Sequence, residues 1–258
     1  MVNPTHIEVP LFIQLADHPL RWLLLTELAS SDQRVRELVE AVGQPQNLVS
    51  YHLRVLRDGG LVTARRSSYD GRDTYYHLDL SRCAEGLTSA GAALHPGLRM
   101  GTPSESRRSM TATPSVLFVC TGNSARSPIA EALLRHHLGG RVVVASAGIS
   151  PRTRIHPEAV RVLREQFDID IDDHTPRTID EVTGHAGSGT VATFARIVTL
   201  CDKAREHLPQ GCGGRRIHWS LADPADMPPR AQHASFGSTT ANIDTRVRHL
   251  ILALENER

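Results

Sequence analysis

The sequence predicts two domains, a small helical domain that ends in a β-hairpin and a larger α/β domain with a parallel sheet. Its 258 residues suit one large or two small domains. Residues 96–114 are rich in Pro, Ser, Thr and Gly and lack an apolar period, which is typical of a flexible linker. Helical periodicity precedes this stretch, and an apolar strand that leads into a helix follows it. We therefore expect one domain over 1–95 and another over 115–258.

Three helices are predicted in the region before the linker. Apolar residues recur at helical spacing over 19–28, 35–42 and 46–58. Gly43 and Gly59 follow the second and third of these segments, as glycine commonly does where a helix ends.

Two short strands follow the helices. Residues 61–66 and 74–80 flank the turn signal Asp70-Gly71, and together they predict a β-hairpin. Three helices and then a hairpin make a winged helix-turn-helix. Domains of this shape bind either DNA or proteins, so the fold alone leaves both functions open.

Charge on the third helix and the hairpin favours DNA. The helix has a buried stripe at i, i+4 and i+7, made of Val49, Leu53 and Leu56. Its opposite face carries Asn47, Ser50, Tyr51 and Arg54. Residues 46–66 hold four arginines and one aspartate, so positive charge gathers where phosphates would lie.

The stretch from Val49 to Val62 resembles ArsR-type repressors, and residues 11–80 follow the layout of that family. The resemblance implies a regulator that binds duplex DNA as a homodimer through this domain. The resemblance places five side chains near the major groove, those of Gln46, Asn47, Ser50, Tyr51 and Arg54. It places near the backbone phosphates Arg65, Arg66 and Arg72.

One departure from this family concerns its effector site. Arsenite-sensing members carry Cys-Val-Cys in the helix before the recognition helix, whereas this chain has Arg34-Val35-Arg36. Guanidinium groups do not ligate a soft metalloid. Cys83 and His77 are alternative ligands, but a core thiol and a strand histidine are the favoured interpretation. The sequence therefore leaves the effector of this domain open.

The second domain opens with a strand, a loop and a helix that together predict an oxyanion site. The apolar run Val116–Val119 leads into Cys120, and a helical pattern begins at Pro128. The loop between them is Thr121, Gly122, Asn123, Ser124 and Ala125, followed by Arg126 and Ser127. Backbone N–H groups at a helix N-terminus bind oxyanions and favour a thiolate, and an arginine adds a bidentate fork. The alternative is a structural cysteine at a strand end.

Four stretches in this domain resemble the low-molecular-weight tyrosine phosphatase fold and, within it, the arsenate reductases. They are Cys120–Ser127, Ser146–Gly148, Ile197–Asp202 and His218–Ala225. The resemblance implies an α/β domain with a parallel sheet and a Cys-x5-Arg phosphate loop, residues 120–126.

The resemblance also implies roles for individual residues. Cys120 would be the nucleophile, and Arg126 would clamp the oxyanion. Asn123 would brace the phosphate loop, and Ser127 would hydrogen-bond the Cys120 thiolate. Asp223 would be the general acid that protonates the departing oxygen.

Three functions remain open for such a site. They are thiol-dependent arsenate reduction, hydrolysis of phosphotyrosine, and sensing of an oxyanion without turnover. A phosphotyrosine ring needs apolar walls, whereas the phosphate loop offers Thr121 and Ser124, and Ala225-Asp226 stand where phosphatases of the family tend to carry aromatic residues. A small, polar mouth favours arsenate and hence a role in arsenical resistance.

Reduction also needs a second thiol to release arsenite from Cys120. Thioredoxin-coupled relatives use two further cysteines seven residues apart; the first matches Cys201, but Leu208 occupies the second position. Cys212 lies in a Gly-rich segment and is a possible substitute. We expect an external reductant instead, either mycothiol or glutathione with its redoxin, and an internal disulfide is the alternative.

Composition excludes several other classes. The formal charge is +1, so no overall basic field indicates nucleic-acid binding by the whole chain. Four cysteines, no signal peptide and no long apolar run predict a cytoplasmic protein with reduced thiols and no membrane contact. The fourteen histidines lack ligand spacing, so we expect neither a metal site nor a bound cofactor.

Overall fold

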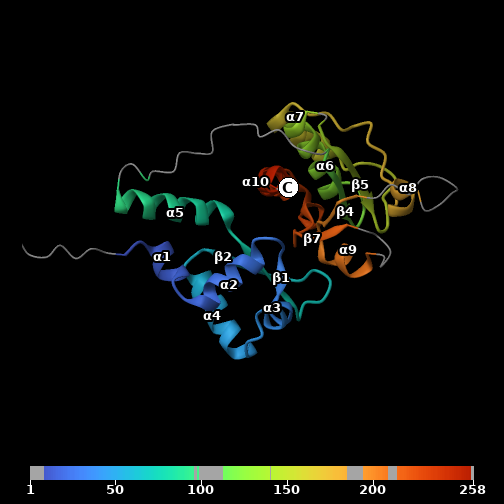
Figure 1. Ribbon diagram of the computed structural model, residues 1–258. Coiled ribbons are helices and arrows are strands. Elements are labelled where there is room, and N and C mark those ends of the chain that lie inside the picture. The colour runs from blue at the N-terminus through green and yellow to red at the C-terminus, as the bar shows by residue number, and fades with distance from the viewer. Residues whose placement is uncertain are drawn as a thin grey trace, which may run out of the picture. The chain divides into compact units, whose positions relative to one another are not determined.

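A computed structural model describes residues 9–95, 98, 113–139, 141–184, 194–208 and 214–256 (Figure 1). The chain divides into two compact units, one of residues 1–67 and 71–107 and the other of residues 68–70 and 108–258. Each unit has its own hydrophobic core. The predicted linker lies outside the described residues, apart from Leu98, Thr113 and Pro114.

In the described residues, the N-terminal unit has five α-helices and a small antiparallel sheet. The helices are α1 (Leu11–Ala16), α2 (Pro19–Leu28), α3 (Val35–Val42), α4 (Gln46–Asp58) and α5 (Leu80–Leu94). The strands, in the order β1-β3-β2, are β1 (Gln33–Arg34), β3 (Thr74–Leu78) and β2 (Val62–Arg66). The three predicted helices and the hairpin are confirmed, and α1, β1 and α5 were not predicted.

Two local interactions set the boundaries of these elements. Gly43 ends α3 with φ of 63°, in the left-handed region that glycine adopts without strain. The second hairpin strand ends at Leu78 rather than at residue 80, because Asp79 caps α5 by accepting a hydrogen bond from the backbone N–H of Arg82. The buried stripe of α4 is confirmed, since Val49, Leu53 and Leu56 are fully buried.

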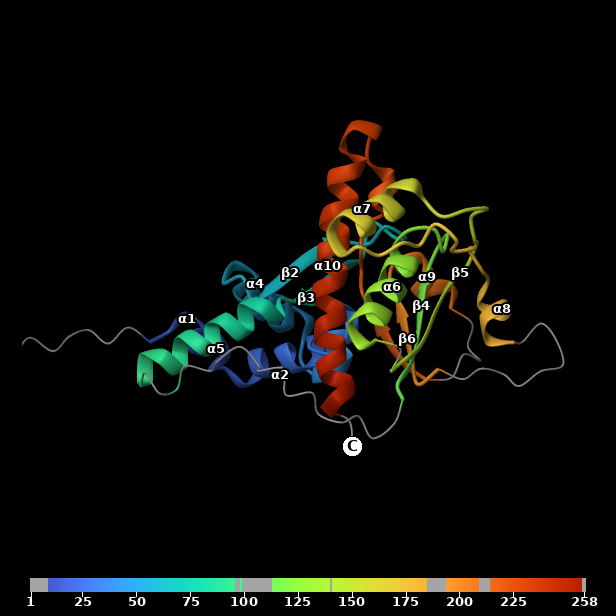
Figure 2. The same ribbon diagram turned by 90° about the horizontal axis from the view of Figure 1, so that it is seen from above.

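The C-terminal unit is an α/β domain with a four-stranded parallel sheet (Figures 1 and 2). Its strands, in the order β5-β4-β6-β7, are β5 (Val143–Gly148), β4 (Ser115–Cys120), β6 (Arg196–Thr199) and β7 (Arg215–His218). Its helices are α6 (Arg126–Leu138), α7 (Pro157–Phe167), α8 (Ile179–Thr183), α9 (Asp202–His207) and α10 (Pro229–Asn256). A 3-10 turn, Pro224–Asp226, precedes α10.

The sequence of β4 explains why this strand is central. Val116, Leu117, Phe118 and Val119 are all fully buried, as a parallel strand with both faces covered requires. On one face of the sheet α6 packs against β4 and β5, and α10 packs in turn against α6 and α7.

Strand order decides where a ligand can bind. The chain leaves β4 in one direction for β5 and later returns to the other side of β4 as β6, so the loops after β4 and β6 diverge. A crevice forms at the carboxyl ends of strands at such a switch point. The segments that follow β4, β6 and β7 therefore meet at one edge of the sheet.

A buried polar cluster stabilises this edge. The Asp202 carboxylate accepts a hydrogen bond from Ser220 Oγ at 2.6 Å and pairs with His218 Nε2 at 3.1 Å. Thr199 Oγ1 lies 2.8 Å from His218 Nδ1, so both ring nitrogens have partners. Burial by itself would raise the pKa of the Asp202 carboxyl, but hydrogen bonds with His218 and Ser220 outweigh it and hold that pKa well below its usual range.

None of the described helices is both long enough and apolar enough to span a membrane.

We predict that Asp202→Asn lowers the free energy of unfolding of this domain by about 3 kcal/mol at pH 7, because it leaves a buried partner uncompensated. Since the pKa of Asp202 is lower in the folded protein, this stabilisation is present above the unfolded pKa of about 3.9 and is lost as the pH falls further. The difference between the wild type and the variant should therefore shrink below about pH 4.

Fluorescence of the buried Trp219, in a Trp22→Phe background that removes the other tryptophan, reports this unfolding. Asp180→Asn, on the exposed first turn of α8, is the control and should change stability by less than about 0.5 kcal/mol. A difference that stays constant down to pH 2 would contradict the prediction.

Candidate active site

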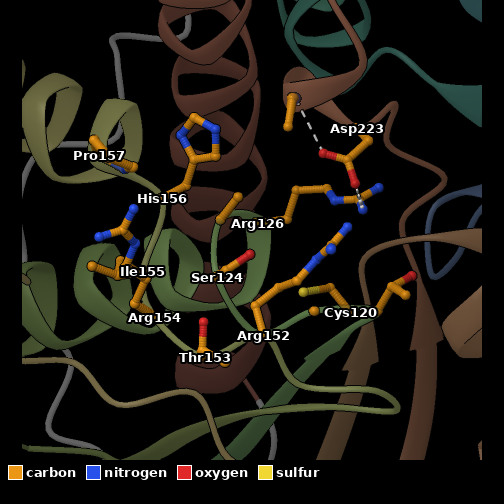
Figure 3. Close-up of a pocket in the computed structure, with 14 residues that line it drawn as sticks. Cys120, Ser124, Arg126, Arg152, Thr153, Arg154, Ile155, His156, Pro157 and Asp223 are labelled. Carbon is orange, nitrogen blue, oxygen red and sulfur yellow. Dashed lines mark hydrogen bonds and ion pairs between the residues drawn. The ribbon is translucent and has the colours of Figure 1, made fainter.

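A cavity of about 460 Å³ opens at the carboxyl edge of the parallel sheet (Figure 3). One wall is the phosphate loop, whose residues Cys120, Thr121, Gly122, Ser124, Ala125 and Arg126 line it. The opposite wall is formed by residues 152–157, and Asp223 and Ala225 lie beside them. The structure thus brings Cys120, Arg126 and Asp223 to one cavity.

The candidate nucleophile, Cys120, lies at the end of β4 and is 2% exposed. Its Sγ is 3.0 Å from Ser127 Oγ, in the first turn of α6. Asn123 Nδ2 donates to the same Ser127 oxygen at 3.0 Å, so the single Ser127 hydroxyl proton can be directed at the sulfur or at the carbonyl of Ala147, 3.3 Å away. A thiolate at this position would accept a charge-assisted hydrogen bond and face the positive end of the α6 dipole.

Asn123 holds the phosphate loop in an unusual backbone conformation. Its φ is 46°, in the left-handed region that Asn tolerates better than most residues. The fully buried Asn123 side chain also donates to Ser146 Oγ at 2.8 Å and accepts from the backbone N–H of Arg177 at 2.8 Å. These bonds tie the loop to β5 and to the segment before α8.

Arg126 supplies a buried guanidinium at the base of the cavity. The residue is 4% exposed; Nη1 donates to the carbonyl of Leu221 at 3.0 Å, and Nη2 donates to Asp223 Oδ2 at 2.5 Å. Its Nε is buried and has no hydrogen-bond partner in the described part of the chain. Burial alone would lower the pKa of Arg126, but the neighbouring groups of Cys120, Cys201 and Asp223 raise it, so the group stays charged.

Asp223 follows β7 and precedes the 3-10 turn. One carboxylate oxygen pairs with Arg126, and the other accepts a hydrogen bond from the backbone N–H of Ala225 at 3.2 Å. Its side chain is 34% exposed, so the carboxylate can exchange a proton with solvent. This location at the cavity rim suits an acid that meets the outermost oxygen of a bound anion.

A second loop, residues 149–156, runs beside the phosphate loop, and sequence reasoning missed it. Backbone N–H groups of Ile149, Ser150, Arg152 and His156 donate to the carbonyls of Cys120, Thr121, Gly122 and Ser124, at distances between 2.8 and 3.1 Å. The only sequence signal is that this loop follows the matched stretch Ser146–Gly148.

His156 closes one side of the cavity. Its ring stacks on Phe236 at 4.6 Å between centroids, and Nδ1 accepts a hydrogen bond from the backbone N–H of Glu158. Burial lowers the pKa of His156, with partial compensation by Glu158 and Asp223. A neutral ring whose Nδ1 accepts a bond carries its proton on Nε2.

Cys201, one of the two possible resolving thiols, lies against the phosphate loop. It is 2% exposed; its Sγ is 3.3 Å from Thr121 Oγ1 and accepts a hydrogen bond from the backbone N–H of Ala204 at the start of α9. Burial raises the pKa of the Cys201 thiol, which is therefore protonated at neutral pH. Leu208 is buried just after α9, and Cys212 lies outside the described residues.

The residues proposed to contact DNA lie at the surface of the N-terminal unit. Six of them are exposed, namely Gln46, Asn47, Tyr51, Arg54, Arg66 and Arg72, whereas Ser50 and Arg65 are half-buried. These six side chains therefore lie at the surface, where a partner can reach them.

The segment where related repressors carry thiols is occupied by ion pairs. Arg34 pairs with Glu37 at 2.6 Å and with Asp73 at 3.0 Å. His77 is 2.9 Å from Asp32, and burial, with Asp79, raises the pKa of Cys83 to about 11. No cluster of three or more His, Cys, Asp or Glu side chains suited to a metal ion occurs in the described ranges.

Comparison with known proteins gives matches for both units. Residues 115–258 match the family described as low molecular weight phosphotyrosine protein phosphatase, and residues 18–64 match the bacterial regulatory proteins of the arsR family. Arsenate reductase 1 of Bacillus cereus is 37% identical over 112 residues, which cover 43% of this chain and 77% of that protein. The arsenate reductase of Brevibacillus brevis is 39% identical, with the same coverage. A solved structure of an arsenate reductase in the phosphate binding state covers 55% of this chain and 98% of its own, at 25% identity and a TM-score of 0.45.

We predict that Ser127→Ala slows alkylation of Cys120 by iodoacetamide at pH 7 by about tenfold, because a thiolate loses a charge-assisted hydrogen bond. Mass spectrometry of the Cys120 peptide measures the rate. Ser124→Ala, in the same loop, should change the rate by less than about twofold, since no hydrogen bond joins Ser124 to the sulfur in the described structure. Equal losses in the two variants would show that Ser127 does not stabilise the thiolate.

Proposed function

Because this chain belongs to the low molecular weight phosphotyrosine protein phosphatase family, we propose that residues 115–258 use the Cys-x5-Arg site for thiol-dependent reduction of arsenate. The observation that carries the proposal is a thiol, a buried guanidinium and a carboxylate around one cavity, with Arg126 Nε left without a partner in the described structure. The relatives named arsenate reductase support this substrate. The arsR-type domain joins this activity to transcriptional regulation.

The first step is attack of Cys120 on arsenate held by the phosphate loop. The sulfur electron pair forms the S–As bond, and the bond from arsenic to the outermost oxygen breaks. That oxygen already carries one proton, accepts a second from Asp223 and leaves as water. Arg126 and the loop N–H groups stabilise the three remaining oxygens.

The second step releases arsenite. A thiolate attacks the sulfur of Cys120, an S–S bond forms, and the electron pair of the S–As bond remains on arsenic, which is reduced from As(V) to As(III). We assign this attack to an external low-molecular-weight thiol, mycothiol or glutathione with its redoxin. The buried, protonated Cys201 and the presence of Leu208 in place of a third thiol support an external donor.

The N-terminal unit supplies the regulatory part of the proposal. We infer that it binds operator DNA as a homodimer in the cytoplasm. Several large apolar side chains of α1 and α5 are more than 40% exposed, and they suit a second copy: Leu11, Ile13, Leu87 and Leu94. Arg54 and Arg66 are exposed on α4 and the hairpin, where DNA phosphates and bases would lie.

We predict that the full chain reduces arsenate with a low-molecular-weight thiol and that Cys120→Ser abolishes turnover. Asp223→Asn should lower turnover by about 100-fold or more while arsenate still binds. Cys201→Ser and Cys212→Ser should keep activity with mycothiol or glutathione systems, as measured by steady-state arsenite formation.

Three outcomes would contradict parts of this scheme. Loss of activity in Cys201→Ser or Cys212→Ser, with thioredoxin sustaining the wild type, would establish an internal disulfide. Efficient hydrolysis of p-nitrophenyl phosphate without arsenate reduction would identify a phosphatase. If neither reaction occurs and arsenate raises the melting temperature, the domain is a sensor.

For the N-terminal unit, we predict that the protein shifts upstream DNA as a dimer and that arsenite does not release it, because Arg34 is engaged with Glu37 and Asp73 where relatives place thiols. Arg66→Ala should weaken binding to all sequences and lower the slope of log K against log salt by about 1. A mobility-shift titration measures both effects. Release at low arsenite that Cys83→Ser abolishes would reveal a metalloid site elsewhere.

A further inference from the structure

Arg152 lies over the phosphate loop and has no role in the scheme above. Its backbone N–H donates to the carbonyl of Gly122 at 2.8 Å, so the start of its side chain is fixed relative to the loop. In Figure 3 this side chain runs across the loop toward the guanidinium of Arg126 and passes above Cys120. Arg154, two residues later on the same wall, points away from Cys120.

Gly122 makes room for this arrangement. A Cβ atom at residue 122 would lie 3.0 Å from Arg152 Cγ and 3.7 Å from Arg152 Nε. A side chain at residue 122 would be in tight contact with Arg152, which would have to shift by a few tenths of an ångström, so the glycine favours the observed position of the arginine.

The charge of Arg152 is not neutralised in the described structure. Asp223 is the carboxylate that lines the cavity, and it pairs with Arg126. No ion pair or side-chain hydrogen bond joins Arg152 to any carboxylate within the described ranges. The cavity therefore holds a second guanidinium that is available to an anion.

We propose that Arg152 is a specificity-determining residue that contacts the outermost oxygen of a bound inorganic oxyanion and so selects such ions over organic esters and organoarsonates. The inference rests on the proposed function, because it names the group that selects the substrate of that site. The observation behind it is the position of Arg152, whose backbone is bonded to Gly122 and whose side chain lines the same cavity as Cys120 and Arg126.

The chemistry of the two ligand classes differs at one atom. The loop N–H groups and Arg126 hold three oxygens of a tetrahedral anion, and the fourth substituent points away from the Cys120 sulfur toward the cavity mouth. In arsenate this substituent is an oxygen that accepts hydrogen bonds from a guanidinium. In an organoarsonate the fourth substituent is carbon, which accepts no hydrogen bond and leaves the Arg152 donors without that partner. In an organic ester it is an oxygen that carries an organic group, which makes it a weaker acceptor than an oxygen of the free ion.

Comparing arsenate with methylarsonate tests the contribution of the fourth oxygen, because the two ions differ only in that a methyl group replaces this oxygen. Each ion is titrated as a protectant of Cys120 in the full chain against iodoacetamide, and the Cys120 peptide is quantified by mass spectrometry. Arg152→Gln should raise the half-protecting concentration of arsenate about tenfold and that of methylarsonate less than about threefold. Arg152→Lys should fall between the wild type and Arg152→Gln for arsenate, since lysine keeps the charge but not the planar fork.

Arg154→Gln is the matched control, because it removes the same charge from the same loop with the guanidinium directed elsewhere. It should change protection by arsenate less than about twofold. The proposal is overturned if Arg152→Gln weakens both ions equally, if it weakens neither, or if Arg154→Gln has the same effect.

Protection does not require turnover, so it separates this inference from the proposed function. If Arg152 discriminates between the two ions but the protein forms no arsenite with any thiol, the inference is supported and the proposed reductase activity is refuted. If the protein forms arsenite but Arg152 does not discriminate between the ions, the reductase activity is supported and the inference about Arg152 is refuted.

Discussion

The backbone hydrogen bonds between residues 149–156 and the phosphate loop are the constraint on which the site depends. They continue the pairing of β4 with β5 beyond the ends of both strands, with Ile149 bonded to Cys120 and His156 bonded to Ser124. The nucleophile and the opposite wall of the cavity are thereby held at fixed separation by main-chain atoms. The side chains on these two loops can therefore differ in size and charge without changing the backbone geometry that holds an anion.

Side-chain hydrogen bonds supply a second level of order at the same edge of the sheet. Asn123 joins the phosphate loop to β5 and to the segment before α8, and it donates to the Ser127 oxygen that lies 3.0 Å from the sulfur of Cys120. Asp202 joins the start of α9 to the end of β7 through His218 and to the segment after β7 through Ser220. Both clusters are buried and paired, which is the condition under which buried polar groups rigidify a site.

Electrostatics separates Arg126 from Arg152, two of the three arginines that line the cavity. Arg126 is buried at the base of the site. Its guanidinium donates to the Leu221 carbonyl and to Asp223, and its Nε has no hydrogen-bond partner in the described structure. Arg152 is exposed, and only its backbone is fixed by a hydrogen bond to the phosphate loop, so its guanidinium lies at the mouth of the cavity. An anion that enters the cavity therefore meets Arg152 at the mouth and Arg126 at the base. The Asp223 carboxylate lies between Arg126 and solvent.

Sequence alone determined the two-domain architecture, the three central helices and the hairpin of the first unit, and the strand–loop–helix that carries Cys120 and Arg126. These features are local, because apolar periodicity, turn residues and a motif of seven residues specify them. Tertiary structure alone decided which distant groups meet there: Arg152 over Gly122, Cys201 against Thr121, and His218 beside Asp202. Those contacts follow from strand order and parallel register, which join segments up to 80 residues apart and leave no periodic trace in the sequence.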